Sequence, residues 1–177
     1  MNILIVDDSP DQQLLLKTIL SKAGHQDLLI ADSATAAYAQ LGIDQPQSNP
    51  HAVDLILMDF LMPGIDGVVA TRHIKNLDAL RDIPIIVVTA KTALGDLQAA
   101  FSAGAMDFIT KPVTSTELLA RVNSALMLKQ EMDCRKAREV ELRRSNDELQ
   151  RALREVKVLK GLVPICASCK KIRNDQG

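Results

Sequence analysis

Five short apolar runs constrain the fold of this 177-residue chain more than any other feature. They show little polar alternation, which is typical of parallel strands covered on both faces of a sheet. The runs are residues 2–6, 28–31, 55–58, 83–90 and 107–110. Segments with helical periodicity separate them. Five strand-then-helix units within about 125 residues predict an α/β fold, a doubly wound domain around a parallel sheet.

Small residues mark the boundaries of the helical segments. Gly24, Gly42 and Gly104 each follow a helical pattern, at the position where a glycine commonly ends a helix. Ser33 precedes the second helical pattern and is expected to cap it. For the first helix, the spacing predicts an apolar face formed by Leu14, Leu15, Thr18 and Ile19.

Polar side chains follow several of the predicted strands where each strand ends. They are Asp7, Asp8, Asp59, Thr89 and Lys111. In doubly wound sheets, ligands bind at this edge. Polar residues at strand ends are common in any soluble domain, which explains one or two of the five but not the whole set. Three neighbouring carboxylates repel one another unless a cation joins them, which points to a hard divalent cation, Mg²⁺.

A phosphoryl group would give the remaining two residues a role. Lys111 can pair with one phosphoryl oxygen, and Thr89 can donate a hydrogen bond to another. A carboxylate is a poor nucleophile, so positioning and charge neutralisation would have to supply the catalysis.

Four motifs follow one another along the chain: "IVDDS" (5–9), "MDFLMPGIDG" (58–67), "VVTA" (87–90) and "TKP" (110–112). Together they resemble the receiver domain of two-component response regulators, the CheY-like family. Each motif alone is weak, but the ordered set is specific and covers residues 1 to 127. The resemblance implies a flavodoxin-like fold, a five-stranded parallel sheet flanked by five helices.

The resemblance also implies a phosphoacceptor and a metal site. Asp59 matches the aspartate that attacks a phosphohistidine on a sensor histidine kinase or phosphotransfer protein. Asp7 and Asp8 match the acid pair that holds Mg²⁺, with Asp59 and the backbone carbonyl of Leu61 as further ligands. We therefore interpret Asp59, which ends an apolar strand, as the nucleophile.

Three further residues match switch and binding positions of the family. Thr89 matches the hydroxyl that moves toward the phosphoryl group, and Lys111 matches the lysine that pairs with it. Phe108 matches the switch aromatic, although a short apolar run is equally compatible with a plain core residue.

The C-terminal part of the chain has a different composition. Residues 1–128 carry 8 Lys/Arg and 14 Asp/Glu, whereas residues 129–177 carry 13 and 8. Residues 116–160 contain no Gly or Pro, which predicts that the fifth helix continues as an extended helix over 128–160.

A heptad register places apolar side chains on one stripe and Asn146 at a core position, which favours a parallel homodimeric coiled coil over a single solvated helix. The d positions are Leu128, Arg135, Leu142, Leu149 and Val156, and the a positions are Met132, Glu139, Asn146, Leu153 and Lys160.

Residues 161–177 contain Cys166-x2-Cys169, half of a possible zinc site. The stretch resembles the beginning of an "LPICxxCKKIR" module of bacterial signalling proteins, in which a later cysteine pair completes the motif. We interpret it as a partial, truncated module, and we do not expect zinc in this chain unless two protomers pool their cysteines.

The composition also argues for and against several functional classes. The three cysteines suit a reducing compartment better than a disulfide framework, and the sequence shows no signal peptide and no long apolar run. These features favour a cytoplasmic protein that does not contact a membrane. Nucleic-acid binding is not expected, because no recognition motif accompanies the basic helix. We expect no enzyme activity beyond the protein's own phosphorylation and dephosphorylation.

Two other functions are alternatives to the response regulator: a phosphorylation-independent dimerisation adaptor and a haloacid-dehalogenase-like phosphatase. The phosphatase fits less well, because its motif requires Asp-x-Asp after the first strand, whereas Asp7 and Asp8 are adjacent in this chain.

Overall fold

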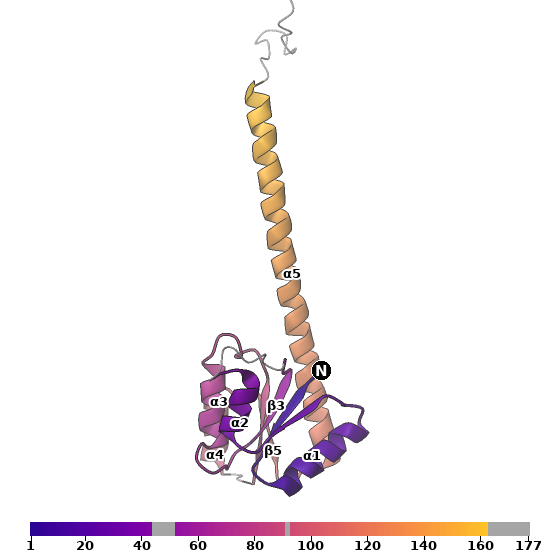
Figure 1. The fold of residues 1–177 in the computed structure, drawn as a ribbon, viewed down its shortest axis with the longest axis vertical. Coiled ribbons are helices and arrows are strands. Elements are labelled where there is room, and N and C mark those ends of the chain that lie inside the picture. The colour runs from indigo at the N-terminus through magenta and orange to yellow at the C-terminus, as the bar shows by residue number, and fades with distance from the viewer. Residues whose placement is uncertain (44–51, 91–92, 163–177) are drawn as a thin grey trace, which may run out of the picture. The chain divides into compact units, whose positions relative to one another are not determined.

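The computed structural model describes residues 1–43, 52–90 and 93–162, with side chains described up to residue 154. Strands and helices alternate along the chain as the apolar pattern predicted (Figure 1). The elements are β1 (Ile3–Val6), α1 (Pro10–Lys22), β2 (Leu28–Ala31), α2 (Ala34–Leu41), β3 (Leu55–Asp59), α3 (Gly67–Lys75), β4 (Ile85–Thr89), α4 (Leu94–Ser102), β5 (Asp107–Thr110) and α5 (Ser115–Leu162).

The five strands form one sheet in the order β2-β1-β3-β4-β5, with every neighbouring pair parallel. Val6 pairs with Met58 across β1 and β3, and Thr89 pairs with Thr110 across β4 and β5. Because all strands run in the same direction, their carboxyl ends meet at one edge. The predicted α/β doubly wound fold is confirmed.

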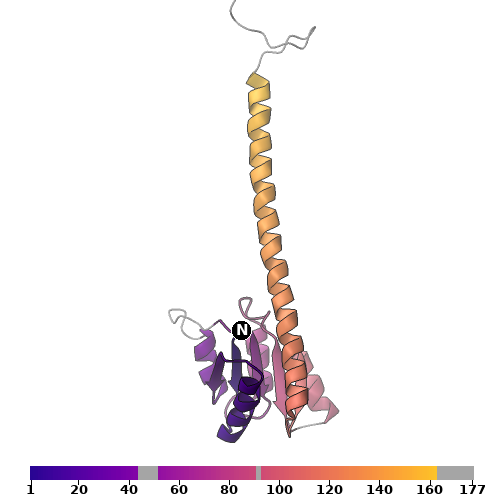
Figure 2. The same cartoon turned by 90° about the vertical axis from the view of Figure 1, so that its right-hand side faces the viewer.

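Helices cover both faces of the sheet. Leu4, Ile56 and Met58 point to the face that packs against α2 and α3, while Ile5 and Leu57 point to the face that packs against α1 and the first turns of α5. A third cluster joins Val87 to α4. Figure 1 shows α2, α3 and α4 on one side of the sheet, and Figure 2 looks onto the layer formed by α1 and the start of α5. Strands buried on both faces explain why their sequences show little polar alternation.

The predicted helix boundaries agree with the structure. The Ser33 side chain accepts a hydrogen bond from the Ala36 N–H, and Gly42 ends α2 with a φ of 71°. The predicted apolar face of α1 is wrong. Leu16 and Leu20 are its buried residues, whereas Leu14 is 64% exposed and Leu15 39%. Three consecutive leucines allow more than one helical face, and the packing against β1 and β3 selects the one centred on Leu16.

The chain folds as two compact units, Met1–Glu131 and Met132–Gly177, and α5 contributes to both. In the first unit, the α5 residues Leu118 and Val122 are fully buried. In the second unit, every described side chain from 133 to 154 is exposed. Within the described residues, no helix combines the length and apolar character that crossing a membrane requires. Cys166 and Cys169 lie outside the described residues.

Candidate functional site

Three carboxylates converge at the carboxyl edge of the sheet. Asp7 and Asp8 follow β1, and Asp59 is the last residue of the neighbouring β3. One oxygen from each of the three lies within 4.8 Å of the others. Asp7 and Asp59 are 1% and 6% exposed, whereas Asp8 faces solvent. Carboxylate oxygens at this spacing are the donors that a hard divalent cation prefers, so the residues present fit Mg²⁺.

Lys111 joins two of these carboxylates. Its Nζ lies 3.0 Å from Asp7 Oδ2 and 2.8 Å from Asp59 Oδ1. Its backbone N–H donates to the Thr89 carbonyl at 2.8 Å, which holds the end of β5 next to the end of β4. The Lys111–Pro112 peptide bond that follows is cis. Lys111 thus places an ammonium group inside the acidic cluster.

Burial and charge together set the protonation of this cluster. Burial raises the pKa of the Asp59 carboxyl above its ordinary value of 3.8, and the neighbouring Asp7 adds to the effect. The hydrogen bond from Lys111 opposes this rise but does not cancel it. For Lys111, burial lowers the pKa, but the hydrogen bonds to Asp59 and Asp7 together with their negative charges outweigh burial and leave the pKa raised. Lys111 is therefore a fixed cation, while Asp59 takes up a proton more readily than an ordinary carboxyl.

Backbone and side-chain contacts from the start of α1 fix Asp7. The Ser9 N–H donates to Asp7 Oδ1 at 2.9 Å, and Gln13 Nε2 donates to the Asp7 carbonyl at 2.7 Å. Since Lys111 pairs with Oδ2, both oxygens of Asp7 are engaged. Ser9 and Gln13 were not identified as site residues from sequence, because nothing in their spacing indicates that the chain folds back at this point.

The backbone after Asp59 makes a close turn. The Gly67 N–H donates to the Phe60 carbonyl at 2.9 Å, and a Cβ on Gly67 would lie 1.9 Å from the Asp59 carbonyl oxygen. Only glycine fits such a close approach of two backbone segments. The Asp66 side chain caps α3 by accepting from the Val69 N–H at 2.7 Å. Gly67 therefore positions Asp59, a role that its place in the "GIDG" motif did not reveal.

The remaining predicted residues lie along the same edge or beside it. Thr89 ends β4 and is 1% exposed, while Leu61, just after Asp59, is 52% exposed. Phe108 on β5 is half-buried and contacts Phe101 and Arg121. The structure thus brings the carboxylates, Thr89 and Lys111 to one edge.

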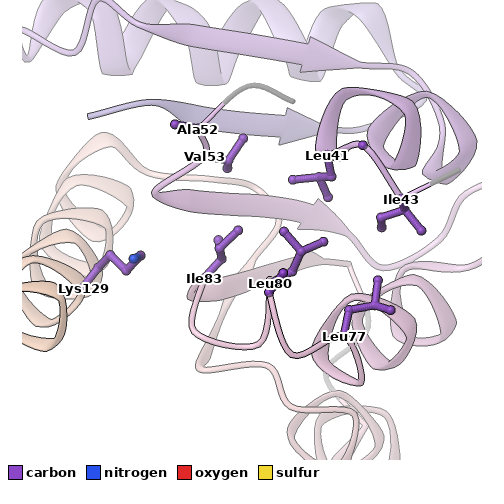
Figure 3. A pocket seen from close by; sticks show the side chains of 10 residues that line it. Leu41, Ile43, Ala52, Val53, Leu77, Leu80, Ile83 and Lys129 are labelled. Carbon is purple, nitrogen blue, oxygen red and sulfur yellow. The ribbon is translucent and has the colours of Figure 1, made fainter. Parts of the chain in front are cut away.

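A groove of about 630 Å³ lies at the opposite edge of the sheet, near the starts of β3 and β4 (Figure 3). Its walls are mostly apolar, and Lys129 is the one charged residue among the described residues that line it. None of the predicted site residues lines it, so the groove is separate from the candidate site at the carboxyl edge.

Comparison with known proteins identifies the family of this chain. The family model of the response regulator receiver domain matches residues 3–123, which include the acidic cluster, Thr89 and Lys111. The chain belongs to this family. The receiver is 38% identical over 124 residues to the protein PilH of Pseudomonas aeruginosa, covering 70% of this chain and 96% of PilH. A CheY-like receiver domain protein from Methanospirillum hungatei superposes with a TM-score of 0.64 at 27% identity, covering 74% of this chain and 97% of that one.

The chain spans only part of some longer relatives. It is 34% identical over 142 residues to the cyclic di-GMP phosphodiesterase response regulator RpfG of Xanthomonas campestris pv. campestris, covering 80% of this chain and 36% of RpfG. Membership of the receiver family places this domain among those of two-component signalling proteins. Receiver domains generally bind Mg²⁺ at an acidic pocket, and in this chain Asp7, Asp8 and Asp59 form an acidic cluster.

Proposed function

We propose that this protein is a response regulator receiver that accepts a phosphoryl group on Asp59 with Mg²⁺ bound beside it. The observation that carries the proposal is the convergence of Asp7, Asp8 and Asp59 within 4.8 Å, with Lys111 paired to two of them. A structural ion-pair network would not need the exposed third carboxylate of Asp8. A phosphoryl-transfer site needs it, because the cation has to be reachable from solvent.

In the proposed reaction, an Asp59 carboxylate oxygen attacks the phosphorus of a partner's phosphohistidine. The oxygen–phosphorus bond forms as the phosphorus–nitrogen bond breaks, which leaves an aspartyl phosphate and a free histidine. Asp7, Asp8, Asp59 and the Leu61 carbonyl would hold Mg²⁺, and the bound ion would supply positive charge beside the transferring oxygens. Lys111 exchanges its contact with Asp59 for a phosphoryl oxygen, and Thr89 donates a hydrogen bond to another. No general base is needed, because the nucleophile is already an anion.

The proposed signal leaves the site through β4 and β5. Thr89 moves toward the phosphoryl group, and Phe108 repositions on the same sheet face, which alters the surface around α4 and α5. The backbone hydrogen bond from Lys111 to the Thr89 carbonyl supports this route, because it ties the two strand ends together.

The second half of α5 supports a parallel homodimer as the output element. Leu142, Leu149 and Leu153 are 70%, 62% and 61% exposed and recur at d and a positions of one heptad register. A long isolated helix needs a partner for such a stripe. Phosphorylation would then change the geometry or strength of the dimer, since α5 also packs in the receiver core through Leu118 and Val122. In this proposal the segments are a receiver (1–127), a coiled coil (128–160) and a partial cysteine module (161–177).

Sedimentation of the full chain with Mg²⁺, with and without beryllofluoride as a phosphoryl mimic, tests the proposal. A change in dimerisation or shape that occurs in the wild type and not in Asp59→Ala supports a phospho-switch. Binding of the mimic without such a change makes the helix a constitutive dimeriser. Failure to bind either Mg²⁺ or the mimic favours the phosphorylation-independent adaptor.

The site of phosphorylation separates the receiver from the haloacid-dehalogenase-like phosphatase. Acetyl phosphate with Mg²⁺ should label Asp59, as mapped by mass spectrometry, and the label should disappear in Asp59→Asn. A label on Asp7 instead would favour the phosphatase, which carries its nucleophile after the first strand.

A further inference from the structure

The Phe108 ring is held from several directions. The ring of Phe101 on α4 meets it at a centroid distance of 5.8 Å and an interplanar angle of 80°, a favourable edge-to-face geometry. The guanidinium carbon of Arg121 on α5 lies 5.6 Å from the ring centroid, within the range of a cation–π interaction. The Phe108 N–H also donates to Asp107 Oδ1 at 2.8 Å. Contacts from α4 and α5 therefore hold the ring where it lies.

Arg121 is itself held in place by two carboxylates. Its Nη1 lies 2.5 Å from Asp107 Oδ2, and its Nη2 lies 3.0 Å from Glu117 Oε1. Hydrogen bonding to Asp107 is the main cause of a further rise in the pKa of Arg121, so the cation persists at any working pH. Asp107 serves both partners, because its other oxygen accepts the Phe108 N–H. The guanidinium is thus a fixed positive group against the ring.

Phe108 shares a sheet face with the proposed phosphoryl site. It pairs with Val87 in the β4–β5 register, and Val87 lies two residues before Thr89 on β4. Because side chains alternate along a strand, Phe108, Val87 and Thr89 point to the same face. Phe108 also packs against the cluster that contains Val87 and Ala100. If the Phe108 ring moves along this face, a change at Thr89 is transmitted to the contact between the ring and Arg121.

We propose that Arg121 is a positioning residue that holds the Phe108 ring in its resting position and so sets how readily the receiver adopts its phosphorylated form. The inference rests on the proposed function, in which Phe108 is the switch ring. When the ring moves, it loses its contact with the guanidinium, so Arg121 favours the resting state. A ligand that prefers the phosphorylated form binds more tightly once the stabilisation of the resting state by Arg121 is removed.

Calorimetric titration of the full chain with beryllofluoride in excess Mg²⁺ tests the role of Arg121. Arg121→Gln should bind the mimic about two- to fivefold more tightly, as expected for loss of a partly exposed cation–π contact. Arg121→Lys keeps a cation and should remain close to the wild type. Arg81→Gln is the matched control. Arg81 lies away from the site and forms a similar surface ion pair, in which its Nη1 is 3.2 Å from Asp78 Oδ1. Unchanged or weaker binding by Arg121→Gln would overturn the inference.

A double-mutant cycle separates ring positioning from a general loosening of the fold. In a Phe108→Leu background, Arg121→Gln should leave the affinity for the mimic unchanged, because the ring that it restrains is gone. If the tighter binding persists in that background, Arg121 does not act through Phe108. Circular dichroism of each variant confirms that the compared proteins are folded.

Fluorine NMR gives a readout on the ring itself. The chain has three phenylalanines, so 4-fluorophenylalanine labelling gives three signals, and Phe108→Leu assigns the one of interest. Without the mimic, the Phe108 signal of Arg121→Gln should move toward its position in mimic-bound wild type, and no such movement would contradict the inference. A wild type that binds no mimic contradicts the proposed function. A wild type that binds it, with Arg121→Gln unchanged, contradicts only the role of Arg121.

Discussion

Lys111 Nζ lies 2.8 Å from Asp59 Oδ1, and the same ammonium group lies 3.0 Å from Asp7 Oδ2. One lysine therefore neutralises part of the charge of two buried carboxylates. In the proposed reaction this cation has two opposite effects, because it stabilises the transferring phosphoryl group but competes with Mg²⁺ for the same oxygens.

Lys111→Met should therefore change Mg²⁺ binding and phosphorylation in opposite directions. Calorimetry should show tighter Mg²⁺ binding, since the carboxylates lose their competing cation. The phosphorylation rate with acetyl phosphate should fall by about 10²–10³-fold, the typical cost of removing one charge-stabilising group. The free energy of unfolding without Mg²⁺ should fall by about 2 kcal/mol, below the value for a fully buried pair because Lys111 is 20% exposed.

Lys75→Met is the control for that variant. Lys75 is also a half-buried lysine, but it donates to the carbonyls of Arg81 and Ile83 at 2.9 Å and 2.5 Å. Its loss should lower stability and leave Mg²⁺ affinity unchanged. Equal effects of both variants on Mg²⁺ affinity would argue against a specific competition at the acidic cluster.

Mg²⁺ should stabilise the folded protein through the acidic cluster. At a concentration 100-fold above its Kd, a ligand that binds only the folded state adds about 2.7 kcal/mol to the free energy of unfolding. Thermal unfolding with and without Mg²⁺ should show this gain in the wild type and its loss in Asp8→Asn. Asp78→Asn, which removes an acid whose side chain is 93% exposed, should retain the gain. Equal stabilisation of both variants would place the cation elsewhere.

The raised pKa of Asp59 predicts an unusual pH dependence of stability without Mg²⁺. Between 3.8 and the raised value, the folded state binds more protons than the unfolded state, so this carboxyl makes the protein less stable as pH rises. Asp59→Asn should therefore be more stable than the wild type at pH 7, by about 1 kcal/mol, the size of a typical single substitution. The difference should shrink as pH falls toward 3.8. Thermal unfolding across this pH range, in EDTA, measures it, and a wild type that is more stable at pH 7 would refute the prediction.

Gly67→Ala should distort the turn that positions Asp59. The new Cβ would lie 1.9 Å from the Asp59 carbonyl oxygen, a backbone atom that cannot give way easily. We expect a loss of about 1–3 kcal/mol in the free energy of unfolding and a slower phosphorylation rate. Gly95→Ala is the matched control, since nothing lies within 4 Å of its Cβ position in α4. That variant should be neutral or slightly stabilising in a denaturant titration, and phosphorylation should be unaffected.

The heptad register of α5 can be tested with two exposed apolar residues on the same helix. Leu149 is 62% exposed at a predicted d position, and Val140 is 68% exposed outside the seam. Leu149→Asp should weaken the dimer by at least tenfold in sedimentation equilibrium, because two carboxylates would face each other in the core. Val140→Asp should leave it intact. If both variants weaken the dimer equally, or if neither weakens it, the proposed heptad register is wrong.

Much of the fold and of the candidate site could be predicted from sequence. Gly24 and Gly104 ended their helices with positive φ, and the apolar runs became the five parallel strands of one sheet. Asp7, Asp8, Asp59, Thr89 and Lys111 lie at one edge because strand direction alone brings them there. Their roles in phosphorylation, and the dimer, stay predictions. The wrong face of α1 shows the limit of a local pattern, because three adjacent leucines fit two helical faces equally well.

The sequence by itself determined the order of the elements and the chemistry at the strand ends, because periodicity, turn residues and strand direction are local properties of the chain. Only the tertiary structure decided which side chains meet. It placed Arg121 against Phe108, Gln13 on the Asp7 carbonyl and Gly67 against the backbone of Asp59. The physical reason is that such contacts depend on strand register and on helix rotation over the sheet. These are fixed by close packing of residues that are distant in the chain.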